Sequence, residues 1–279
     1  MPITAVPILE ALGATITGVT GGELTDPAVG AEVSDALDRH SVLVFPELFI
    51  DDDDLVALSH HLGEVVVPPL GGGIEGHPEI LPICKDPAIN KFAEFHKGND
   101  HWHVDGTSYE RPDKATLLSA KQAPDEGEGD TEFASMYAAY EALPDDEKAQ
   151  LEGLRVRHTL AASQRLVYPD PTPEQVATWA KRAPREHPLV WRRADGRASL
   201  LLGSTAEAIV DMPEDESRAL IDRLMAWSTQ ERFTLRHRWR EGDLVIFDNT
   251  ALVHRSLPYV ATSPRLMHRT TLVGELAVA

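Results

Sequence analysis

Short apolar segments bounded by turn-forming residues recur along the sequence, most densely after residue 110. Segments of this length that are rich in β-branched and aromatic residues predict strands. We expect strands at residues 12–19, 41–45, 115–120, 154–160, 189–192, 199–202, 233–236, 243–247, 251–255 and 266–273. So many short strands favour a single β-sandwich or jelly-roll core.

Helical patterns occupy fewer segments. Residues 27–40 and 213–229 place apolar side chains at helical spacing. The acidic run at residues 51–54 indicates the N-cap and first turn of a helix, because the ligand spacing of an EF-hand calcium loop is absent. Shorter helices are expected at residues 136–143, 145–154 and 173–183. The predicted fold class is therefore mainly β with flanking helices, around a double-stranded β-helix (jelly-roll) core.

No linker divides the sequence, so we expect one domain spanning residues 1–279. Proline and glycine interrupt residues 68–77, residues 84–99 lack a clear period, and residues 161–188 form a long insertion. Irregular segments on a rigid scaffold often carry function. The segments near 68–100 and 161–188 are therefore candidate lids over a site.

Residues 100–106 place two histidines and a carboxylate, His101, His103 and Asp105, on alternate positions. Alternate side chains of a strand point to one face, so His103 and Asp105 could bind one metal ion together. A third ligand must come from elsewhere, and His254, at the end of a strand-like run, is the best candidate. Two histidines and one carboxylate are the ligand set of the facial triad in non-haem Fe(II) oxygenases.

The composition limits the partners and the location of the protein. A formal charge of −19 argues against nucleic acid or an anionic membrane as a partner, and an anionic substrate would need local arginines. No apolar run approaches a membrane span, and the N-terminus lacks the features of a signal peptide. Cys84 is the only cysteine, so no internal disulfide can form, and we expect a cytoplasmic protein.

Five motifs, in order along the chain, resemble the TauD/TfdA family of Fe(II)- and 2-oxoglutarate-dependent dioxygenases. They are His103-x-Asp105, Gly129-Asp130-Thr131, the segment GDLVIFDN at 242–249, His254 with Arg265 eleven residues later, and MHRTT at 267–271. Residues 129–133, 138–143 and 236–239 resemble the 2,4-dichlorophenoxyacetate branch more than taurine dioxygenase. The loop after Gly63 and Glu64 also lacks the substrate-binding histidine of the taurine enzymes.

The resemblance implies the metal centre. His103, Asp105 and His254 match the ligands of the iron, which is Fe(II) in this family. The co-substrates are 2-oxoglutarate and O₂. The position of Asp105 favours hydroxylation, because halogenating relatives lack this carboxylate.

The resemblance also implies contacts to the co-substrate and the substrate. Thr131 and Arg265 match the residues that hold the distal carboxylate of 2-oxoglutarate, and a guanidinium suits that task because it meets both oxygens. Arg269 matches a second arginine near the co-substrate that often faces an anionic group of the substrate. Asn99 matches a substrate-side asparagine, and His101 is expected to contact either the substrate or a metal ligand.

The predicted reaction hydroxylates a small anionic organic substrate, or cleaves it after hydroxylation, and gives succinate and CO₂. A carboxylate, sulfonate or sulfate group would supply the negative charge. Two alternatives are a jelly-roll protein with hydrolytic activity at Zn²⁺ or Ni²⁺, and a non-catalytic binding protein. Relatives are commonly dimers or tetramers, which predicts a homo-oligomer by analogy. The sequence does not identify the primary substrate.

Overall fold

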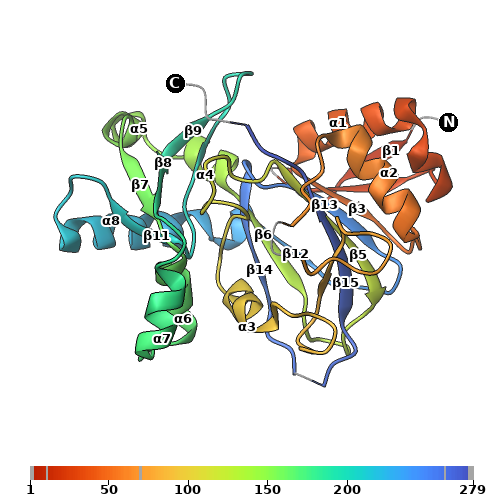
Figure 1. Ribbon diagram of the computed structural model, residues 1–279. Helices are drawn as coiled ribbons and strands as arrows, with labels where there is room; N and C mark the ends of the chain where they lie inside the picture. Colours follow the sequence, from red (N-terminus) through yellow and green to blue (C-terminus); the bar gives the residue numbers. More distant parts are fainter. Residues whose placement is uncertain (1–2, 11, 69–70, 261, 276–279) are drawn as a thin grey trace.

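Two β-sheets packed face to face form the centre of the molecule (Figure 1). The computed structural model describes residues 3–10, 12–68, 71–260 and 262–275. In these residues the strands are β1 (Thr4–Pro7), β2 (Ala14–Thr17), β3 (Val42–Phe45), β4 (Leu81–Ile83), β5 (Ala115–Gln122), β6 (Thr131–Ser135), β7 (Arg155–His158), β8 (Arg185–Pro188), β9 (Val190–Arg192), β10 (Ala198–Leu200), β11 (Ala206–Ile209), β12 (Thr234–His237), β13 (Leu244–Asp248), β14 (Leu252–Ser256) and β15 (Leu266–Thr271). The helices are α1 (Pro27–His40), α2 (Asp52–Leu62), α3 (Ala93–His96), α4 (Met136–Glu141), α5 (Asp145–Leu151), α6 (Leu160–Val167), α7 (Pro173–Trp179) and α8 (Glu214–Ser228), with 3-10 turns η1 (Gly22–Thr25), η2 (Lys97–Asp100) and η3 (Glu231–Phe233).

The two central sheets have the arrangement of a jelly roll. Over the described residues, the larger sheet has the order β1-β2-β3-β13-β5-β15-β4, and the smaller sheet has the order β12-β6-β14. Their strand pairs are antiparallel, apart from the parallel pair of β2 and β3. The predicted class, mainly β with flanking helices around a jelly-roll core, is confirmed.

Alternation along β13 separates two hydrophobic cores. Val245 and Phe247 pack between the two sheets, whereas Leu244 and Ile246 pack on the opposite face against residues of α1 and α2. A strand that is buried on both faces reads as a continuous apolar run, which explains the sequence of residues 244–247. The helices therefore cover the outer face of the larger sheet and leave its inner face to the site.

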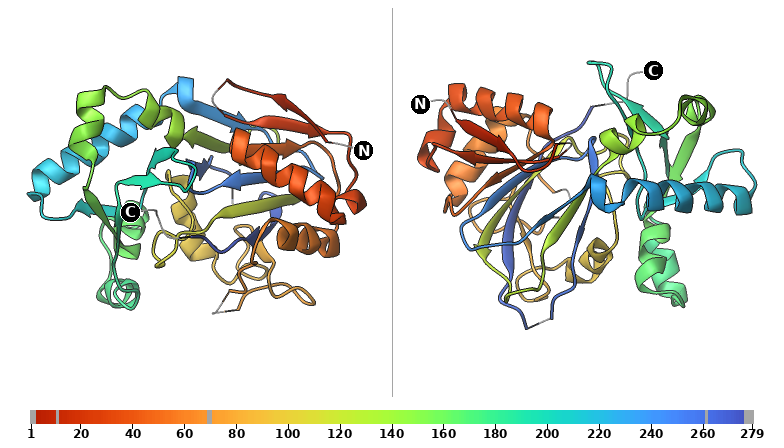
Figure 2. Two further views of the ribbon diagram at one scale, coloured as in Figure 1. Left: turned by 90° about the horizontal axis from the view of Figure 1, so that it is seen from above. Right: turned by 180° about the vertical axis from the view of Figure 1, so that it is seen from behind.

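Residues 136–228, which we call the accessory layer, cover the outer face of the smaller sheet (Figures 1 and 2). Ala134 of β6 and Val253 of β14 share a hydrophobic core with residues of α4, α8 and the sheet β11-β7-β8. Arg193, just after β9, pairs with the buried Asp248 at 2.6 Å and with Asp38 of α1 at 2.7 Å. The accessory layer is thus attached to the jelly roll by both apolar and ionic contacts.

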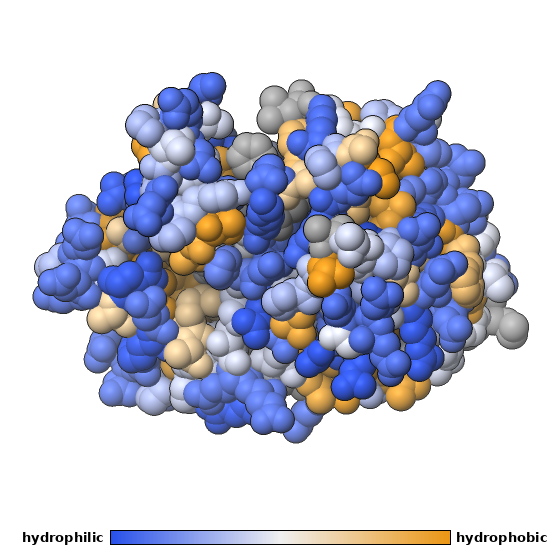
Figure 3. Space-filling model, turned by 90° about the horizontal axis from the view of Figure 1, so that it is seen from below, coloured by the Kyte–Doolittle hydropathy of each residue, from blue (hydrophilic) through white to orange (hydrophobic). Residues whose placement is uncertain are grey.

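The surface offers no large apolar face in the view of Figure 3, where hydrophilic residues dominate and apolar residues form separate patches. Among the helices of the described residues, none has the length and apolar character needed to span a bilayer.

Most expected elements are present, with ends that shift by a few residues. The predicted N-cap is confirmed: the Asp51 side chain accepts a hydrogen bond from the Asp54 backbone N–H at 2.8 Å. The sequence did not indicate β1, β4, β6, β8, β11, α3 or α6, because these short elements have no clear apolar period. The expected loop at 68–77 is irregular where it is described, and Pro69 and Leu70 lie outside the described residues.

The prediction that the stretch at residues 100–106 forms a strand is wrong. In this segment of the described chain, only His103 forms a strand contact, as an isolated bridge to His254. Gly106 has φ 77° and lies in a turn that begins at Asp105. A positive φ suits glycine and ends an extended segment, so Asp105 is held in a turn and not in a strand.

The buried His158 at the end of β7 gives a prediction about acid stability. Burial lowers the pKa of its imidazole to about 3. An unfolded histidine has a pKa of about 6.5, so between these values the proton binds to the unfolded state and not to the folded state. The contribution of neutral His158 to the unfolding free energy is therefore fully present above about pH 6.5, and it decreases as the pH falls below this value. Between pH 7 and pH 5 we expect the unfolding free energy of the wild type to fall by about 2 kcal/mol more than that of His158→Asn.

Urea unfolding at the two pH values measures this difference. His60→Asn, which removes an exposed imidazole on α2, is the matched control and should keep the pH dependence of the wild type. Equal pH dependence in the wild type and His158→Asn would contradict the assignment of a neutral, buried His158.

Candidate metal centre and co-substrate site

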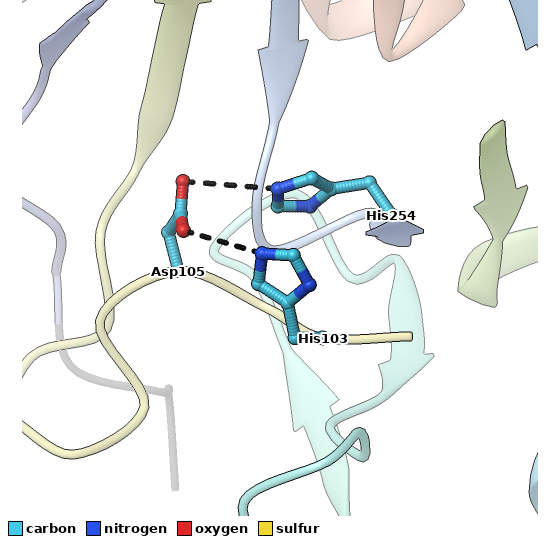
Figure 4. Close-up of side chains that lie close together, drawn as sticks. All are labelled: His103, Asp105 and His254. Atoms are coloured by element: carbon cyan, nitrogen blue, oxygen red, sulfur yellow. Dashed lines mark ion pairs between the residues drawn. The ribbon is translucent and has the colours of Figure 1, made fainter. Parts of the chain in front are cut away.

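His103, Asp105 and His254 lie together inside the jelly roll (Figure 4). The Nε2 atom of His103 is 3.8 Å from Oδ1 of Asp105, and the Nε2 atom of His254 is 3.9 Å from Oδ2 of the same carboxylate. The two imidazole rings are 4.1 Å apart between centroids. Three potential ligand atoms within 4.8 Å of one another form a group that could hold a metal ion.

Backbone pairing brings the two histidines together. The backbone N–H of His103 donates to the carbonyl of His254 at 2.9 Å, and the reverse bond has the same length. His254 lies on β14, where alternation turns its side chain inward against the rings of Phe133 and Phe247. Asp105 follows two residues after His103, in the turn. The geometry therefore depends on one bridge and one turn rather than on two strands.

The protonation states suit metal binding. Burial lowers the pKa of His103 and lowers that of His254 to about 3, so both imidazoles are neutral at pH 7. Burial alone would raise the pKa of Asp105, but the guanidinium of Arg269 and the hydrogen bond from Thr116 hold it well below its usual range. Two neutral imidazoles and one ionised carboxylate are the donor set of a divalent transition metal.

Different contacts orient the imidazole rings of His103 and His254. The Nδ1 atom of His103 is 2.8 Å from the carbonyl of His101, and donation from Nδ1 leaves the lone pair of Nε2 facing Asp105. The Nδ1 atom of His254 is buried without a hydrogen-bond partner in the described residues. The orientation of His254 therefore depends on its packing against Phe133 and Phe247.

Two residues that the sequence analysis did not select hold Asp105. Thr116 on β5 donates its hydroxyl to Oδ2 of Asp105 at 2.9 Å, and Asn249 donates to the Thr116 hydroxyl at 2.9 Å. The side-chain carbonyl of Asn249 also accepts a hydrogen bond from the Asp105 backbone N–H at 3.4 Å. Asn249 belongs to the segment GDLVIFDN and is fully buried, so its place in that motif was the available signal.

Arg265 is a buried cation near the candidate metal centre. Its Nε donates to the carbonyl of Gly129 at 3.2 Å, and its guanidinium lies 5.1 Å from the centroid of the Tyr259 ring. In the described part of the chain this guanidinium forms no ion pair with a carboxylate. A buried arginine without such a partner is suited to an anionic ligand.

Thr131 on β6 has a hydroxyl oriented by Trp239. The indole Nε1–H donates to the Thr131 oxygen at 2.9 Å. Because an indole N–H is a donor only, the Thr131 oxygen must accept this bond. Its own hydroxyl hydrogen is then free to donate to an anion.

One cavity brings the candidate residues together. Its lining includes all of the residues predicted for the site except His101, namely Asn99, His103, Asp105, Thr131, His254, Arg265 and Arg269. His101 takes part through its backbone carbonyl, which faces Nδ1 of His103. Arg269 on β15 points its Nη1 toward Oδ1 of Asp105 at 3.6 Å, and its Nε is buried without a partner in the described residues.

Lys85 and Tyr259 also line the cavity, and no local sequence pattern indicates them because both lie in irregular segments. The Lys85 ammonium donates to the Tyr259 carbonyl at 2.8 Å and lies 4.1 Å from the centroid of its ring. The Tyr259 ring therefore contacts both Lys85 and Arg265.

On the outer face of β14, Arg255 pairs with Glu132 at 2.7 Å, as strand alternation predicts.

Comparison with known proteins extends over nearly the whole chain. Residues 4–271 match the family described as Taurine catabolism dioxygenase TauD, TfdA family. The chain is 30% identical to the α-ketoglutarate-dependent 2,4-dichlorophenoxyacetate dioxygenase of Cupriavidus pinatubonensis, over 100% of both chains. It is also 30% identical to the α-ketoglutarate-dependent sulfate ester dioxygenase of Pseudomonas putida, over 98% of this chain and 90% of the relative. The predicted resemblance to the 2,4-dichlorophenoxyacetate branch is confirmed.

Solved structures agree with the sequence comparison. The crystal structure of AAD-2 in complex with Mn(II) and N-oxalylglycine has a TM-score of 0.82 at 30% identity, over 99% of this chain and 100% of that chain. A taurine dioxygenase from Burkholderia xenovorans has a TM-score of 0.80 at 30% identity, over 100% of this chain and 92% of that chain. The chain therefore belongs to the TauD/TfdA family of Fe(II)- and 2-oxoglutarate-dependent dioxygenases.

Proposed function

We propose that His103, Asp105 and His254 hold Fe(II), and that the enzyme oxidises a C–H bond of a small anionic compound. The observation that carries the proposal is the buried group of two neutral imidazoles and one carboxylate beside a cavity that also contains Arg265. Bound Fe(II) supplies the oxidising chemistry, in which O₂ is consumed while 2-oxoglutarate loses CO₂ to give succinate. The chain itself supplies position, charge and exclusion of water.

We propose that Arg265 and Thr131 bind the distal carboxylate of 2-oxoglutarate. The guanidinium is buried and has no carboxylate partner in the described residues, and the Thr131 hydroxyl is free to donate. N-oxalylglycine, bound in the AAD-2 structure, carries a carboxylate at each end, as 2-oxoglutarate does. Thr116 and Asn249 keep the Asp105 carboxylate oriented while the co-substrate enters.

The substrate side of the cavity is assigned to Arg269 and Asn99. Arg269 has a buried Nε without a partner in the described residues, so it retains a donor for an anionic group. Relatives named for 2,4-dichlorophenoxyacetate, phenoxypropionate and sulfate esters support a carboxylate, sulfonate or sulfate on the substrate. For His101 we propose an indirect role, in which its carbonyl orients His103.

The remaining expectations are part of the same proposal. Lys85, Asn99 and Asp100 line the cavity, which supports a lid formed by the segment near 68–100. The segment at 161–188 reaches the turn after Asp105 through the bond from Arg182 to the Ser108 hydroxyl at 3.0 Å. A single domain, a homo-oligomer and a cytoplasmic location are retained as proposals, the last supported by the lone, buried Cys84.

The two alternatives are not favoured. A hydrolytic Zn²⁺ or Ni²⁺ site has no support among relatives that are named as dioxygenases. A non-catalytic binding role would not require the neutral imidazoles, the ionised carboxylate and the buried arginine to be kept together.

Removing a ligand tests the metal assignment. We expect His103→Ala to weaken Fe(II) binding by about 100-fold or more, and to abolish the O₂-dependent conversion of 2-oxoglutarate to succinate. His101→Ala keeps the backbone carbonyl that faces His103, so its metal affinity should match the wild type. Anaerobic metal titration and succinate assay provide the two measurements. Succinate formation by His103→Ala at the wild-type rate would refute the ligand assignment.

Arg265→Lys tests the co-substrate contact. A lysine keeps the charge but cannot make the paired bonds of a guanidinium, so 2-oxoglutarate should bind about 10- to 100-fold more weakly. The measurement is anaerobic titration of the Fe(II)-loaded protein with 2-oxoglutarate, followed by the visible absorption band of the chelate. Arg218→Lys, which changes an exposed arginine of α8, should titrate like the wild type. An unchanged midpoint in Arg265→Lys would exclude this residue as the anchor.

A substrate panel tests the role of Arg269. Phenoxyacetates and alkyl sulfates should stimulate succinate formation, whereas the methyl esters and alcohols of the same carbon skeletons should not. Arg269→Gln should reduce this preference for anions by about tenfold, since it loses a charge-assisted contact. Equal stimulation of the wild type by anionic and neutral compounds would argue against an anionic substrate.

A further inference from the structure

Residues 102–109, which we call the ligand loop, carry two of the three proposed metal ligands outside any strand. On its inner side the loop is held by the His103 bridge and by the contacts of Asp105 with Thr116 and Asn249. Irregular backbone does not keep a ligand geometry by itself, because metal sites need their ligands held within about 0.5 Å. Contacts on the outer side of the ligand loop would therefore also help to keep the two ligands in position.

The accessory layer contacts the backbone of the ligand loop directly. The backbone N–H of Ser204 donates to the carbonyl of Trp102 at 2.7 Å. Gly203 has φ 135°, and a Cβ added there would lie 3.0 Å from the Cα of His103. This close approach places the segment that leads into β11 against the first ligand of the loop.

Side chains of the accessory layer then hold the second half of the ligand loop. The Thr205 hydroxyl is 2.8 Å from the Thr107 hydroxyl and 2.9 Å from Nδ1 of His158. His187 places its Nε2 3.0 Å from the carbonyl of Thr107. Thr107, His158 and His187 are all buried. Thr107 is two residues from Asp105, so these contacts fix the turn that carries the carboxylate.

The direction of the hydrogen bonds follows from the surroundings of His158. Its Nε2 is buried and has no partner in the described residues, so the single proton of the neutral ring is best placed on Nδ1. Nδ1–H then donates to Thr205, and the Thr205 hydroxyl donates to Thr107. Burying a polar group costs free energy of folding unless the group is hydrogen-bonded. Apolar side chains could fill the same space without needing such partners, so packing alone does not explain these polar residues.

We infer that Thr205, His158 and His187 are positioning residues for the metal centre, which hold the ligand loop so that Asp105 faces His103 and His254. The inference rests on the proposed assignment of His103 and Asp105 as ligands. None of the three positioning residues touches the proposed metal or co-substrate, since they do not line the cavity. They belong to the accessory layer, which lies on the opposite side of the ligand loop from the larger sheet.

Thr205→Val tests the inference, because valine has nearly the shape of threonine and lacks the hydroxyl. We expect its affinity for Mn(II), measured anaerobically on the full chain, to fall by roughly tenfold, at the lower end of the effect of losing an outer contact. Thr205→Ser, which restores the hydroxyl, should bind Mn(II) within about twofold of the wild type. The KM for 2-oxoglutarate should stay within about twofold in both variants, because Arg265 and Thr131 lie elsewhere.

Thr234→Val is the matched control, since in the described residues its hydroxyl bonds to the backbone carbonyls of Thr229 and Gln230 and to no other group. Its Mn(II) affinity should equal that of the wild type. If Thr205→Val does not fold, His187→Phe removes the other side-chain contact to Thr107 and should weaken Mn(II) binding to a similar extent.

Three results overturn the inference, and they are distinguishable. Wild-type Mn(II) affinity in Thr205→Val, with binding lost in His103→Ala, would leave the ligand assignment intact and refute the positioning role. Equal weakening in Thr205→Val and Thr205→Ser would show that packing rather than the hydroxyl matters. A wild-type protein that binds no Mn(II) would refute the ligand assignment and this inference together.

Discussion

The paired backbone hydrogen bonds between His103 and His254 are the contact on which the rest of the site depends. They join a turn-rich segment to a strand of the smaller sheet, and both imidazoles then face the same carboxylate. Asp105 adds two supports of its own, Thr116 and Asn249, from the larger sheet and the turn after β13. The site therefore combines residues that are distant in sequence. The sheets and the accessory layer that hold these residues are stabilised by three hydrophobic cores.

Much of this arrangement can be predicted from the sequence where a local pattern carries the information. Residues 244–247 indicate a strand because both of its faces are buried, and the spacing from His103 to Asp105 indicates a shared ligand role. Arg265 and Thr131 were identified only through the order of motifs along the chain. Nothing in their immediate neighbours distinguishes a buried anion-binding arginine from one in a surface ion pair.

Most of the missed features depend on contacts between distant segments, and one depends on a local turn. The alternation of polar residues at 101–105 resembles a strand, but Gly106 turns the chain and leaves a single bridge. Tyr259 and Lys85 meet only because two irregular segments approach each other at the cavity. The polar contacts of the ligand loop with the accessory layer likewise require the tertiary fold, and isolated histidines in a sequence do not reveal them.

The register between β14 and β6 has a consequence for how such enzymes can diversify. Residue 254 pairs with residue 133 and residue 256 pairs with residue 131, so one register aligns both His254 and Thr131 with the inner face. A slip of one residue in β14 would turn Arg255 inward and remove the proposed metal contact of His254, and the same slip in β6 would remove the proposed co-substrate contact of Thr131. We therefore expect a single insertion or deletion in either strand to disrupt the site. The irregular segment 84–100 also contributes to the cavity, and we expect its length to vary more freely than that of the strands without moving the reacting centre.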